Sequence, residues 1–410
     1  MASAYDEVPY DTEANVETHP VAMATLARLA GLTPAPAWHA RVLEIGCGDG
    51  ENLGAAAAYL PEARFVGFDL AERAIELGKK TALANVELRV GDLATIEGLG
   101  AFDYVIAHGL YSWVPVRDEL LRLLRASLAP NGVGFISFNA LPGWRFRGSM
   151  RELMRDRTRG IDSPGDKVRT ALGVVDELAR GGAGAPGYLG ALAKDAAEYL
   201  EHVKLATPPR SAFSHYVFHD LLAETNDAFS YPEMESRLAE AGLRIISETP
   251  LRRRPLEELP FLQLLVQRDD DPAPAPIDAA RADELFLWAD LAPTENGAFR
   301  TSTGFAVRPP AESALARVAA SAPGFVRVKD VDPDPRFAAQ VLEGFRDGVF
   351  VLRSEPPVLT GEVPSFVRER GARTGLLTSA IHRSYRVESV DLTSPVMRQR
   401  LHRLAFTEAP

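Results

Sequence analysis

The chain has 410 residues, 46% hydrophobic and 25% charged, the balance of a folded protein of two or three domains, so wholesale disorder is excluded. Its 45 basic and 56 acidic side chains give a net charge of −11, so no nucleic-acid partner is expected from bulk electrostatics. It contains no run of about 18 apolar residues that would span a membrane. The acidic N-terminus and the single cysteine, Cys47, favour a cytoplasmic protein in a reducing compartment.

Along the chain, a weakly patterned N-terminal segment (1–40) contains one expected helix, Val21–Ala30. From Arg41 onward, short apolar strands alternate with helices of ten or more residues. This alternation predicts parallel βαβ units in a doubly wound, Rossmann-like α/β sheet. The expected strands are Val42–Ile45, Arg64–Phe68, Val86–Val90, Phe102–Ala107 and Val133–Phe138. An alanine-rich helix is expected after Gly50, and further helices at Glu72–Ala84 and Arg117–Leu128.

The alternation breaks after residue 143. Residues 143–230 have a mostly helical pattern, interrupted by a glycine-rich gap at Gly181–Gly190. A helix (Met234–Ala241) and two strands (Leu243–Ser247 and Leu262–Val266) follow, and we expect both strands to return to the sheet. Residues 143–230 are therefore predicted to be a helical insertion near the carboxyl edge of the sheet, within a cofactor-binding domain of residues 41–270.

The prolines of Asp269–Pro276 predict a semi-rigid linker. Residues 277–410 are then expected to form a separate α+β accessory domain, in which no motif is tied to chemistry. Its expected helices are Ala279–Asp290, Ala314–Ser321 and Phe337–Phe345, and its expected strands are Phe299–Val307, Val349–Leu352 and Tyr385–Val390.

A glycine cluster follows the first strand of the sheet: Gly46, Gly48 and Gly50 alternate with Cys47 and an aspartate. Glycine at a strand-to-helix turn lets the backbone turn tightly and approach a ligand. A dinucleotide motif would need glycine at position 51, which is glutamate. The tighter spacing, with Glu44 inside the preceding strand, suits a ligand without a pyrophosphate.

Two further acids follow the next two strands. Asp69 closes the second strand, where its carboxylate can accept both ribose hydroxyl protons. Asp92 follows the third strand, within reach of an adenine edge. Either acid taken singly is compatible with a solvated strand end, but the series describes an adenosine held at both ends. Together with the glycine loop, this pattern predicts S-adenosyl-L-methionine as the cofactor.

Five segments carry a family resemblance: LEIGCGDG (43–50), FVGFDL (65–70), VGDL (90–93), FDYVIAHGLYSWVP (102–115) and FISFNALPGW (135–144). They resemble class I S-adenosylmethionine-dependent methyltransferases. More narrowly, they are similar to the group with a methyltransferase regulatory domain, which includes bacterial lysine methyltransferases of outer-membrane proteins. Tyr5, Pro9, Tyr10 and the pair His19–Pro20 also fit this group. The match persists more weakly at 219–229 and 379–388.

The resemblance implies a protein or peptide nucleophile, such as a lysine amine, as acceptor, a regulatory C-terminal domain and a possible homodimer. The expected cofactor contacts are Tyr10, Glu44, Gly46, Cys47, Gly48, Gly50, Asn52, Asp69, Leu70, Asp92, Leu93 and His108. For Cys47, a small residue that suits a tight turn is a better explanation than a nucleophile.

Two loops leave the ligand-binding edge together, one after the fourth strand and one after the fifth. They supply the candidate catalytic residues His108, Tyr111 and Asn139, and Tyr111, Trp113 and Trp144 as candidate walls of the acceptor channel. In-line methyl transfer needs alignment of the nucleophile, exclusion of water and, for an amine, a deprotonated nitrogen. The alternative is that these aromatic rings only pack the insertion onto the sheet and that His108 is structural.

Tyr5 and Tyr10 are expected either to fold over the cofactor, with Tyr5 facing the substrate, or to belong to a non-functional tail. No metal site is expected, and the pair His215 and His219 is better explained by hydrogen bonding than by metal binding. A small-molecule or natural-product O- or N-methyltransferase and a non-catalytic regulatory protein with the same fold remain open alternatives.

Overall fold

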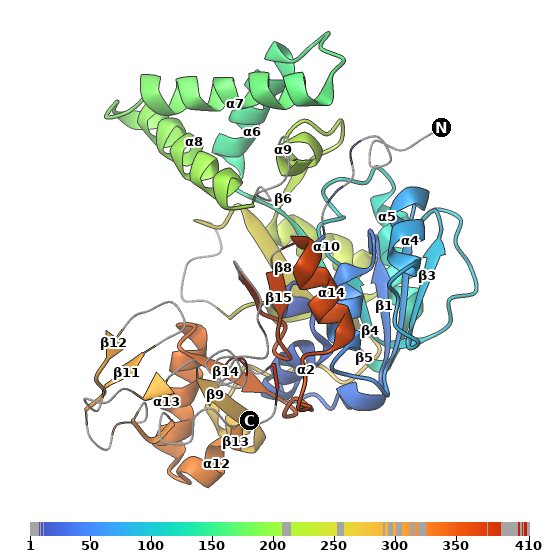
Figure 1. Ribbon diagram of the computed structural model, residues 1–410, viewed down its shortest axis with the longest axis vertical. Coiled ribbons are helices and arrows are strands. Elements are labelled where there is room, and N and C mark those ends of the chain that lie inside the picture. The colour runs from blue at the N-terminus through green and yellow to red at the C-terminus, as the bar shows by residue number, and fades with distance from the viewer. Residues whose placement is uncertain are drawn as a thin grey trace.

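The structure is a computed structural model of the chain (Figure 1). It describes residues 8, 10, 12–206, 215–251, 258–289, 292–293, 298–300, 306–310, 313, 316–318, 325–374, 376–386, 401, 404 and 406–407. Within these residues, none of the helices has the length and apolar character that a bilayer crossing requires.

An eight-stranded sheet forms the centre of the molecule, in the order β3-β2-β1-β4-β5-β8-β7, with β6 paired to β5. The first five strands are mutually parallel, so their carboxyl ends meet at one edge. Strands β8 and β7 are antiparallel to their neighbours, which confirms the predicted return of both to the sheet. The strands are β1 (Arg41–Ile45), β2 (Arg64–Asp69), β3 (Val86–Val90), β4 (Phe102–Ala107), β5 (Leu128–Leu141), β6 (Ala228–Ser230), β7 (Leu243–Glu248) and β8 (Phe261–Arg268).

Helices cover both faces of this sheet because successive strand residues point to opposite sides. Val42 belongs to a core shared with α2, α3 and α4, whereas Leu43 belongs to a core shared with α5 and α10. This arrangement confirms the predicted doubly wound α/β fold. The helices are α2 (Pro20–Leu29), α3 (Glu51–Ala57), α4 (Glu72–Lys79), α5 (Arg117–Ser127) and α10 (Tyr231–Glu240).

Helices also fill the stretch between β5 and β6, where they form the green lobe of Figure 1. They surround a small apolar core of their own that includes Met150, Val175 and Tyr199. The predicted glycine gap is shorter than expected, because α7 ends at Gly181 and the next helix already begins at Gly187. The helices are α6 (Arg145–Arg157), α7 (Pro164–Gly181), α8 (Gly187–Ala206) and α9 (His215–Asp220).

The C-terminal part mixes short strands and helices, as predicted, but two of the expected elements differ. The expected helix Ala279–Asp290 is a short 3-10 helix, η4 (Ala279–Glu284), followed by strand β9 (Phe286–Ala289). Strand β9 pairs with an antiparallel strand on each side, and most of its side chains are buried. This pairing overrides the helical pattern of the sequence. The expected strand Phe299–Val307 is instead two antiparallel strands, β11 (Phe299–Arg300) and β12 (Ala306–Val307).

Other C-terminal predictions agree where the structure describes them. Helix α13 (Pro335–Arg346) and strand β14 (Phe350–Arg353) match the expected elements. The expected strand Tyr385–Val390 is described only to residue 386, and the expected helix 314–321 only at 316–318. The remaining elements are η1 (Val16–Thr18), η2 (Ala37–His39), β10 (Ala292–Pro293), β13 (Val326–Arg327), α12 (Val328–Val331), α14 (Ser365–Thr374), β15 (Leu376–Thr378) and β16 (Ser384–Arg386).

Candidate active site

The glycine loop lies at the carboxyl end of β1, next to the end of β2. Gly46, Gly48 and Gly50 have φ angles of 74°, 56° and 76°, a left-handed backbone that L side chains rarely adopt. A Cβ on Gly48 would lie 2.6 Å from the Cγ2 of Thr12. Cys47 is buried, and its Sγ packs on the site where Gly67 has no side chain. Burial raises the pKa of its thiol, so the structure favours the packing explanation for this cysteine.

Glu44 and Asn52 form a buried polar pair beneath the loop. The Nδ2 of Asn52 donates to the Oε1 of Glu44 at 2.9 Å, while the Oε2 of Glu44 is buried without a hydrogen-bond partner among the described residues. Burial raises the pKa of Glu44 to about 8, and the hydrogen bond from Asn52 opposes that shift. A cationic group brought next to Oε2 would satisfy this oxygen and favour the ionised carboxylate.

Asp69 holds the loop and the start of the next turn. Its Oδ2 accepts the N–H of Gly48 at 2.8 Å, and its Oδ1 accepts the N–H of Ala71 at 2.8 Å. A carboxylate has further lone pairs, so both oxygens can still accept hydroxyl protons. Leu70 beside it is 59% exposed, open to contact with a ligand.

Asp92 is exposed at the end of β3, and its Oδ1 accepts the N–H of Ala94 at 2.8 Å. Leu93 next to it is half-buried against the core that contains α5. Asp69 and Asp92 thus end neighbouring strands at the same edge as the glycine loop, in the predicted order.

The N-terminal segment lies across the glycine loop, which sequence reasoning did not resolve. Thr12 donates through its Oγ1 to Asp49, and the backbone N–H of Asn15 donates to the Oδ1 of Asn52 at 3.0 Å. Tyr10 is 40% exposed, and its ring meets the ring of His219 edge-on. Tyr5 lies outside the described residues.

His108 connects this segment to the sheet. Its Nε2 is 3.2 Å from the Nδ2 of Asn15, and its Nδ1 is 3.1 Å from the Oγ of Ser137 on β5. Burial lowers the pKa of His108 to about 4, so the ring is neutral near pH 7. An amide Nδ2 only donates, so Nε2 accepts and Nδ1 donates to Ser137.

Tyr111 and Asn139 lie deeper than an open channel wall would. The Tyr111 ring is fully buried and packs edge-on against Phe138 and Phe229. Asn139 is also buried, and its Nδ2 donates to the Oδ1 of Asn226 at 2.6 Å, which ties β5 to the segment after α9. In this structure both residues hold the loops around the site, and their catalytic roles remain predictions.

The two tryptophans have different surroundings. Trp113 is half-buried and its ring lies 6.5 Å from that of Phe261. Trp144 is 5% exposed and belongs to the core of the helical lobe, with Arg147 over its ring. The geometry of Trp144 therefore matches the packing alternative, whereas Trp113 keeps part of its surface accessible.

The C-terminal part also reaches this site, which the sequence analysis missed. Arg370 of α14 lies 3.3 Å from Asp49 and 3.1 Å from Glu51, and His382 lies 2.8 Å from the Oδ1 of Asn52. A partial signal existed for His382, because segment 379–388 shares the family resemblance. No sequence pattern marked Arg370.

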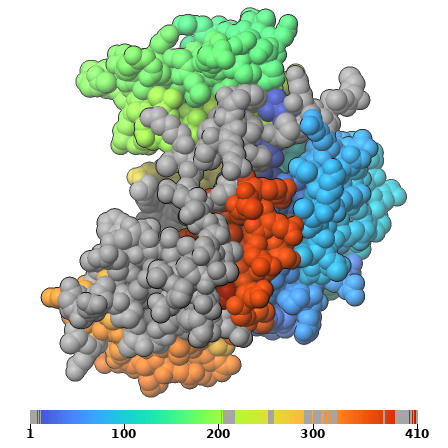
Figure 2. All heavy atoms as spheres, viewed as in Figure 1, coloured from blue at the N-terminus to red at the C-terminus, as the bar shows by residue number. Residues whose placement is uncertain are grey.

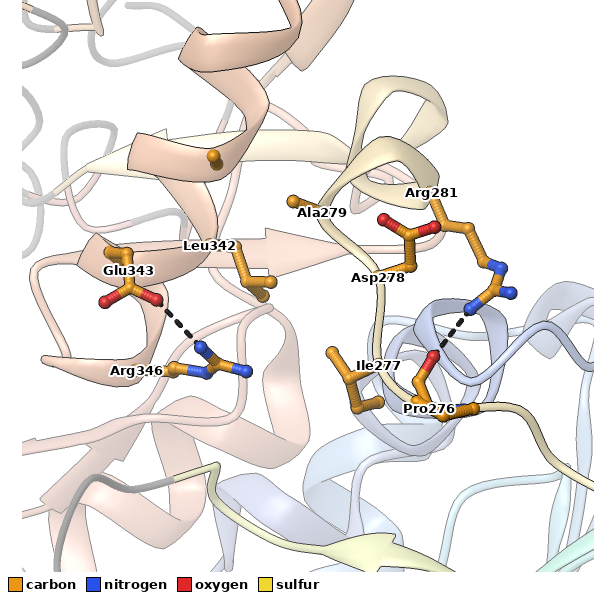
Figure 3. Close-up of a pocket in the computed structure, with 9 residues that line it drawn as sticks. Pro276, Ile277, Asp278, Ala279, Arg281, Leu342, Glu343 and Arg346 are labelled. Carbon is orange, nitrogen blue, oxygen red and sulfur yellow. Dashed lines mark hydrogen bonds and ion pairs between the residues drawn. The ribbon is translucent and has the colours of Figure 1, made fainter.

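A separate groove of about 530 Å³ lies between residues 276–281 and α13 (Figure 3). Its floor includes Ile277 and Leu342, and Arg346 pairs with Glu343 at its rim (Figure 3). It is lined by none of the predicted site residues. Among the described residues, no group of three histidine, cysteine or acidic side chains could hold a metal ion.

The doubly wound sheet, the glycine loop at β1 and the acids that end β2 and β3 define a class of protein. The family described as a methyltransferase domain matches residues 43–133, the same stretch. The chain belongs to the class I S-adenosylmethionine-dependent methyltransferases and is an enzyme that transfers a methyl group from this cofactor to an acceptor.

Two uncharacterized proteins of Rickettsia prowazekii (strain Madrid E) are similar to the chain. One is 40% identical over 173 residues, which cover 40% of this chain and 69% of that protein. The other is 30% identical over 269 residues, which cover 62% of this chain but only 46% of that protein. A trans-aconitate 2-methyltransferase of Variovorax paradoxus (strain S110) is 35% identical over 95 residues, 23% of this chain and 36% of the enzyme.

The fold is also similar to the solved structure of PKMT2 from Rickettsia typhi in complex with AdoHcy. The TM-score is 0.77 at 21% sequence identity, over 98% of this chain and 89% of that one. The likeness therefore covers the sheet, the helical lobe and the C-terminal part together.

The residues present fit S-adenosylmethionine. The buried Oε2 of Glu44, which has no hydrogen-bond partner among the described residues, offers an acceptor to an ammonium group. Asp69 ends β2 with a carboxylate, a group whose oxygens can each accept more than one hydrogen bond, and Asp92 is exposed at the next strand end. Glu44, Asp69 and Asp92 are the residues that would hold the cofactor.

Proposed function

We propose that the enzyme methylates a nucleophile on a protein or peptide, such as a lysine amine. The observation that carries the proposal is the extent of the fold shared with PKMT2, which includes the helical lobe and the C-terminal part as well as the cofactor-binding sheet. The sequence resemblance to protein-lysine methyltransferases supports the same class of acceptor. The proposal keeps residues 277–410 as an accessory, regulatory domain.

S-adenosylmethionine, when bound, supplies an electrophilic methyl group on a sulfonium. The residues of the chain bind the cofactor and orient the acceptor toward it. Thr12 and Asn15 hold the N-terminal segment against the glycine loop through Asp49 and Asn52. His108 is neutral, and its Nε2 accepts a hydrogen bond from Asn15 of the N-terminal segment. Trp113, with its accessible surface, is the proposed wall residue for the acceptor.

A small-molecule acceptor is the second candidate. It is favoured by the likeness to trans-aconitate 2-methyltransferases, but that match covers only 23% of this chain. A match of this length spans less than a quarter of the chain and is too short to carry the acceptor over.

The two candidates are separated by following the methyl group. The purified enzyme is incubated with methyl-labelled S-adenosylmethionine and a lysate of the organism that encodes it, which is then divided into protein and small-molecule fractions. Label recovered from hydrolysed protein as methyl-lysine supports the proposal. Label confined to the small-molecule fraction overturns it. The Asp69→Ala variant serves as the control for enzyme-dependent labelling.

The proposal also includes a cytoplasmic location, the absence of nucleic-acid and membrane partners, and a homodimer. The net charge of −11 supports the absence of a nucleic-acid partner. Cell fractionation tests the location, and light scattering of the purified protein tests the dimer.

A further inference from the structure

Helix α14 and the turn after β15 lie against the cofactor-binding half of the molecule, although about 320 residues separate them in sequence. Figure 2 shows the red atoms of this C-terminal segment side by side with the blue atoms of the N-terminal half. The contact is close: a Cβ on Gly54 of α3 would lie 2.3 Å from the Cζ of Phe366 of α14.

Arg370 is the first polar link from this segment. Arg370 is only 9% exposed, and its guanidinium faces two acids of the glycine-loop region, Asp49 at 3.3 Å and Glu51 at 3.1 Å. It also donates to the backbone oxygen of Thr12 at 2.8 Å. Arg370 thus connects the glycine loop, the start of α3 and the N-terminal segment. Burial raises the pKa of Glu51 to about 8, and the guanidinium of Arg370 opposes that shift.

His382 is the second polar link. It is 1% exposed, has a left-handed backbone (φ 62°) and lies with its Nε2 2.8 Å from the Oδ1 of Asn52. Asn52 in turn donates to Glu44 at 2.9 Å. Oδ1 of Asn52 also accepts the N–H of Asn15, and the Oγ1 of Thr18 lies 3.1 Å from Oδ1 and 3.0 Å from Nδ2, so the amide can turn only if all four partners move. His382 is therefore the group by which the C-terminal part helps to fix the orientation of the amide that positions Glu44.

We propose that Arg370 and His382 are positioning residues of the cofactor site, through which the C-terminal part sets the affinity for S-adenosylmethionine. Arg370 acts through Asp49 and Glu51, and His382 acts through Asn52 and Glu44. The inference rests on the cofactor alone and holds for a protein or a small-molecule acceptor. Failure of the acceptor proposal would therefore leave it standing.

The test is calorimetric binding of S-adenosylhomocysteine to the full chain, which needs no acceptor. His382→Ala removes the hydrogen bond to Asn52 and is expected to weaken binding about tenfold, the effect of one buried hydrogen bond. His382→Gln places an amide N–H near the position of Nε2 and is expected to restore most of the affinity. Arg370→Gln is expected to weaken binding by tenfold or more, because it removes the contacts to Asp49, Glu51 and the backbone oxygen of Thr12 together.

Two controls separate positioning from general stability. Arg368→Gln changes an arginine of the same helix that pairs with the exposed Glu362, and His39→Ala removes an exposed histidine. Both are expected to bind like the wild type. Hydrogen exchange of the amides of residues 46–52 reports the loop directly and is expected to rise in His382→Ala.

Unchanged affinity in both His382→Ala and Arg370→Gln, each folded by circular dichroism, overturns the proposal. So does an equal loss in His382→Ala and His382→Gln without faster exchange in the loop. If Arg370→Gln fails to fold, the two His382 variants still decide the outcome.

Discussion

Asp69 shows how one side chain can serve both the loop and the ligand. Its two oxygens accept the N–H groups of Gly48 and Ala71, so it fixes the loop geometry as well as offering lone pairs to a ribose diol. We expect Asp69→Ala to weaken S-adenosylmethionine binding by about 1–3 kcal/mol. Calorimetry measures this change.

The matched control for Asp69 is Asp103→Ala. Asp103 also accepts a backbone N–H, from Arg41 at 2.8 Å, but it lies near the amino end of β4, away from the carboxyl ends of the strands where the glycine loop lies. Its replacement is expected to leave cofactor affinity unchanged. Equal affinities in the wild type and Asp69→Ala would remove Asp69 from the cofactor site.

Glu44 gives the folded protein a dependence on pH. Burial raises its pKa from 4.5 to about 8, so the folded state retains a proton that the unfolded chain loses in this window. Its contribution to stability is therefore complete below about pH 4.5 and declines as pH rises toward 8, by up to about 1.4 kcal/mol per pH unit.

The neutral, similarly shaped variant Glu44→Gln isolates this contribution. Without cofactor, the free energy of unfolding of the wild type, relative to that of Glu44→Gln, is expected to fall between about pH 5 and about pH 8. Chemical denaturation at the two pH values measures it. A difference that stays constant with pH would show that Glu44 is ionised throughout.

Among the elements, α3 and α14 make a contact in which glycine is required for space rather than for backbone freedom. Alanine within a helix is usually more stable than glycine by about 0.5–1 kcal/mol. At Gly54 the new methyl group would meet Phe366, so we expect Gly54→Ala to destabilise the protein by about 1–3 kcal/mol. Thermal or chemical unfolding measures the change.

Gly173 in α7 provides the comparison, because a Cβ there would meet no atom within 4 Å. Gly173→Ala is expected to follow ordinary helix propensity and to stabilise the protein slightly. If both glycine variants change stability in the same direction, the contact between α3 and α14 does not control packing.

The elements also show what sequence patterns can and cannot predict. Strands such as Phe102–Ala107 were predicted with their observed bounds, because buried parallel strands are continuous apolar runs. The glycine loop was placed for a similar local reason. By contrast, β9 looks helical in sequence and is a strand because β13 and β14 pair with it.

The side-chain contacts between the C-terminal part and the glycine loop were not predicted from the sequence. Arg370 follows an ordinary charged helix pattern, and its role depends on Asp49 and Glu51 lying opposite in the fold. Tyr111 looked like a channel wall because it follows β4, but the structure buries its ring against Phe138 and Phe229. Hydrophobic periodicity predicts which face of a helix or strand is buried, but it does not predict which distant segment packs against that face.

At the scale of the whole molecule, one apolar core runs through α2 and links the sheet to the C-terminal part. It includes Leu26 of α2, Phe135 of β5 and Leu352 of β14. Hydrogen bonds cross at the same place: the N–H of Ser354 donates to the Oγ1 of Thr25 at 2.7 Å. The domain boundary at residue 277 remains a prediction. The shared core determines whether the sheet and the C-terminal part unfold together or separately.

Because the core is continuous, we expect the full chain to unfold in a single calorimetric transition whose calorimetric and van't Hoff enthalpies agree. Saturation with S-adenosylhomocysteine at about 100 times its Kd should stabilise the folded state by about 2.7 kcal/mol and move that transition as a unit. Two resolved transitions, with only one responding to the ligand, would mean that residues 277–410 unfold independently. In that case α14 would separate from the cofactor loop before the sheet unfolds.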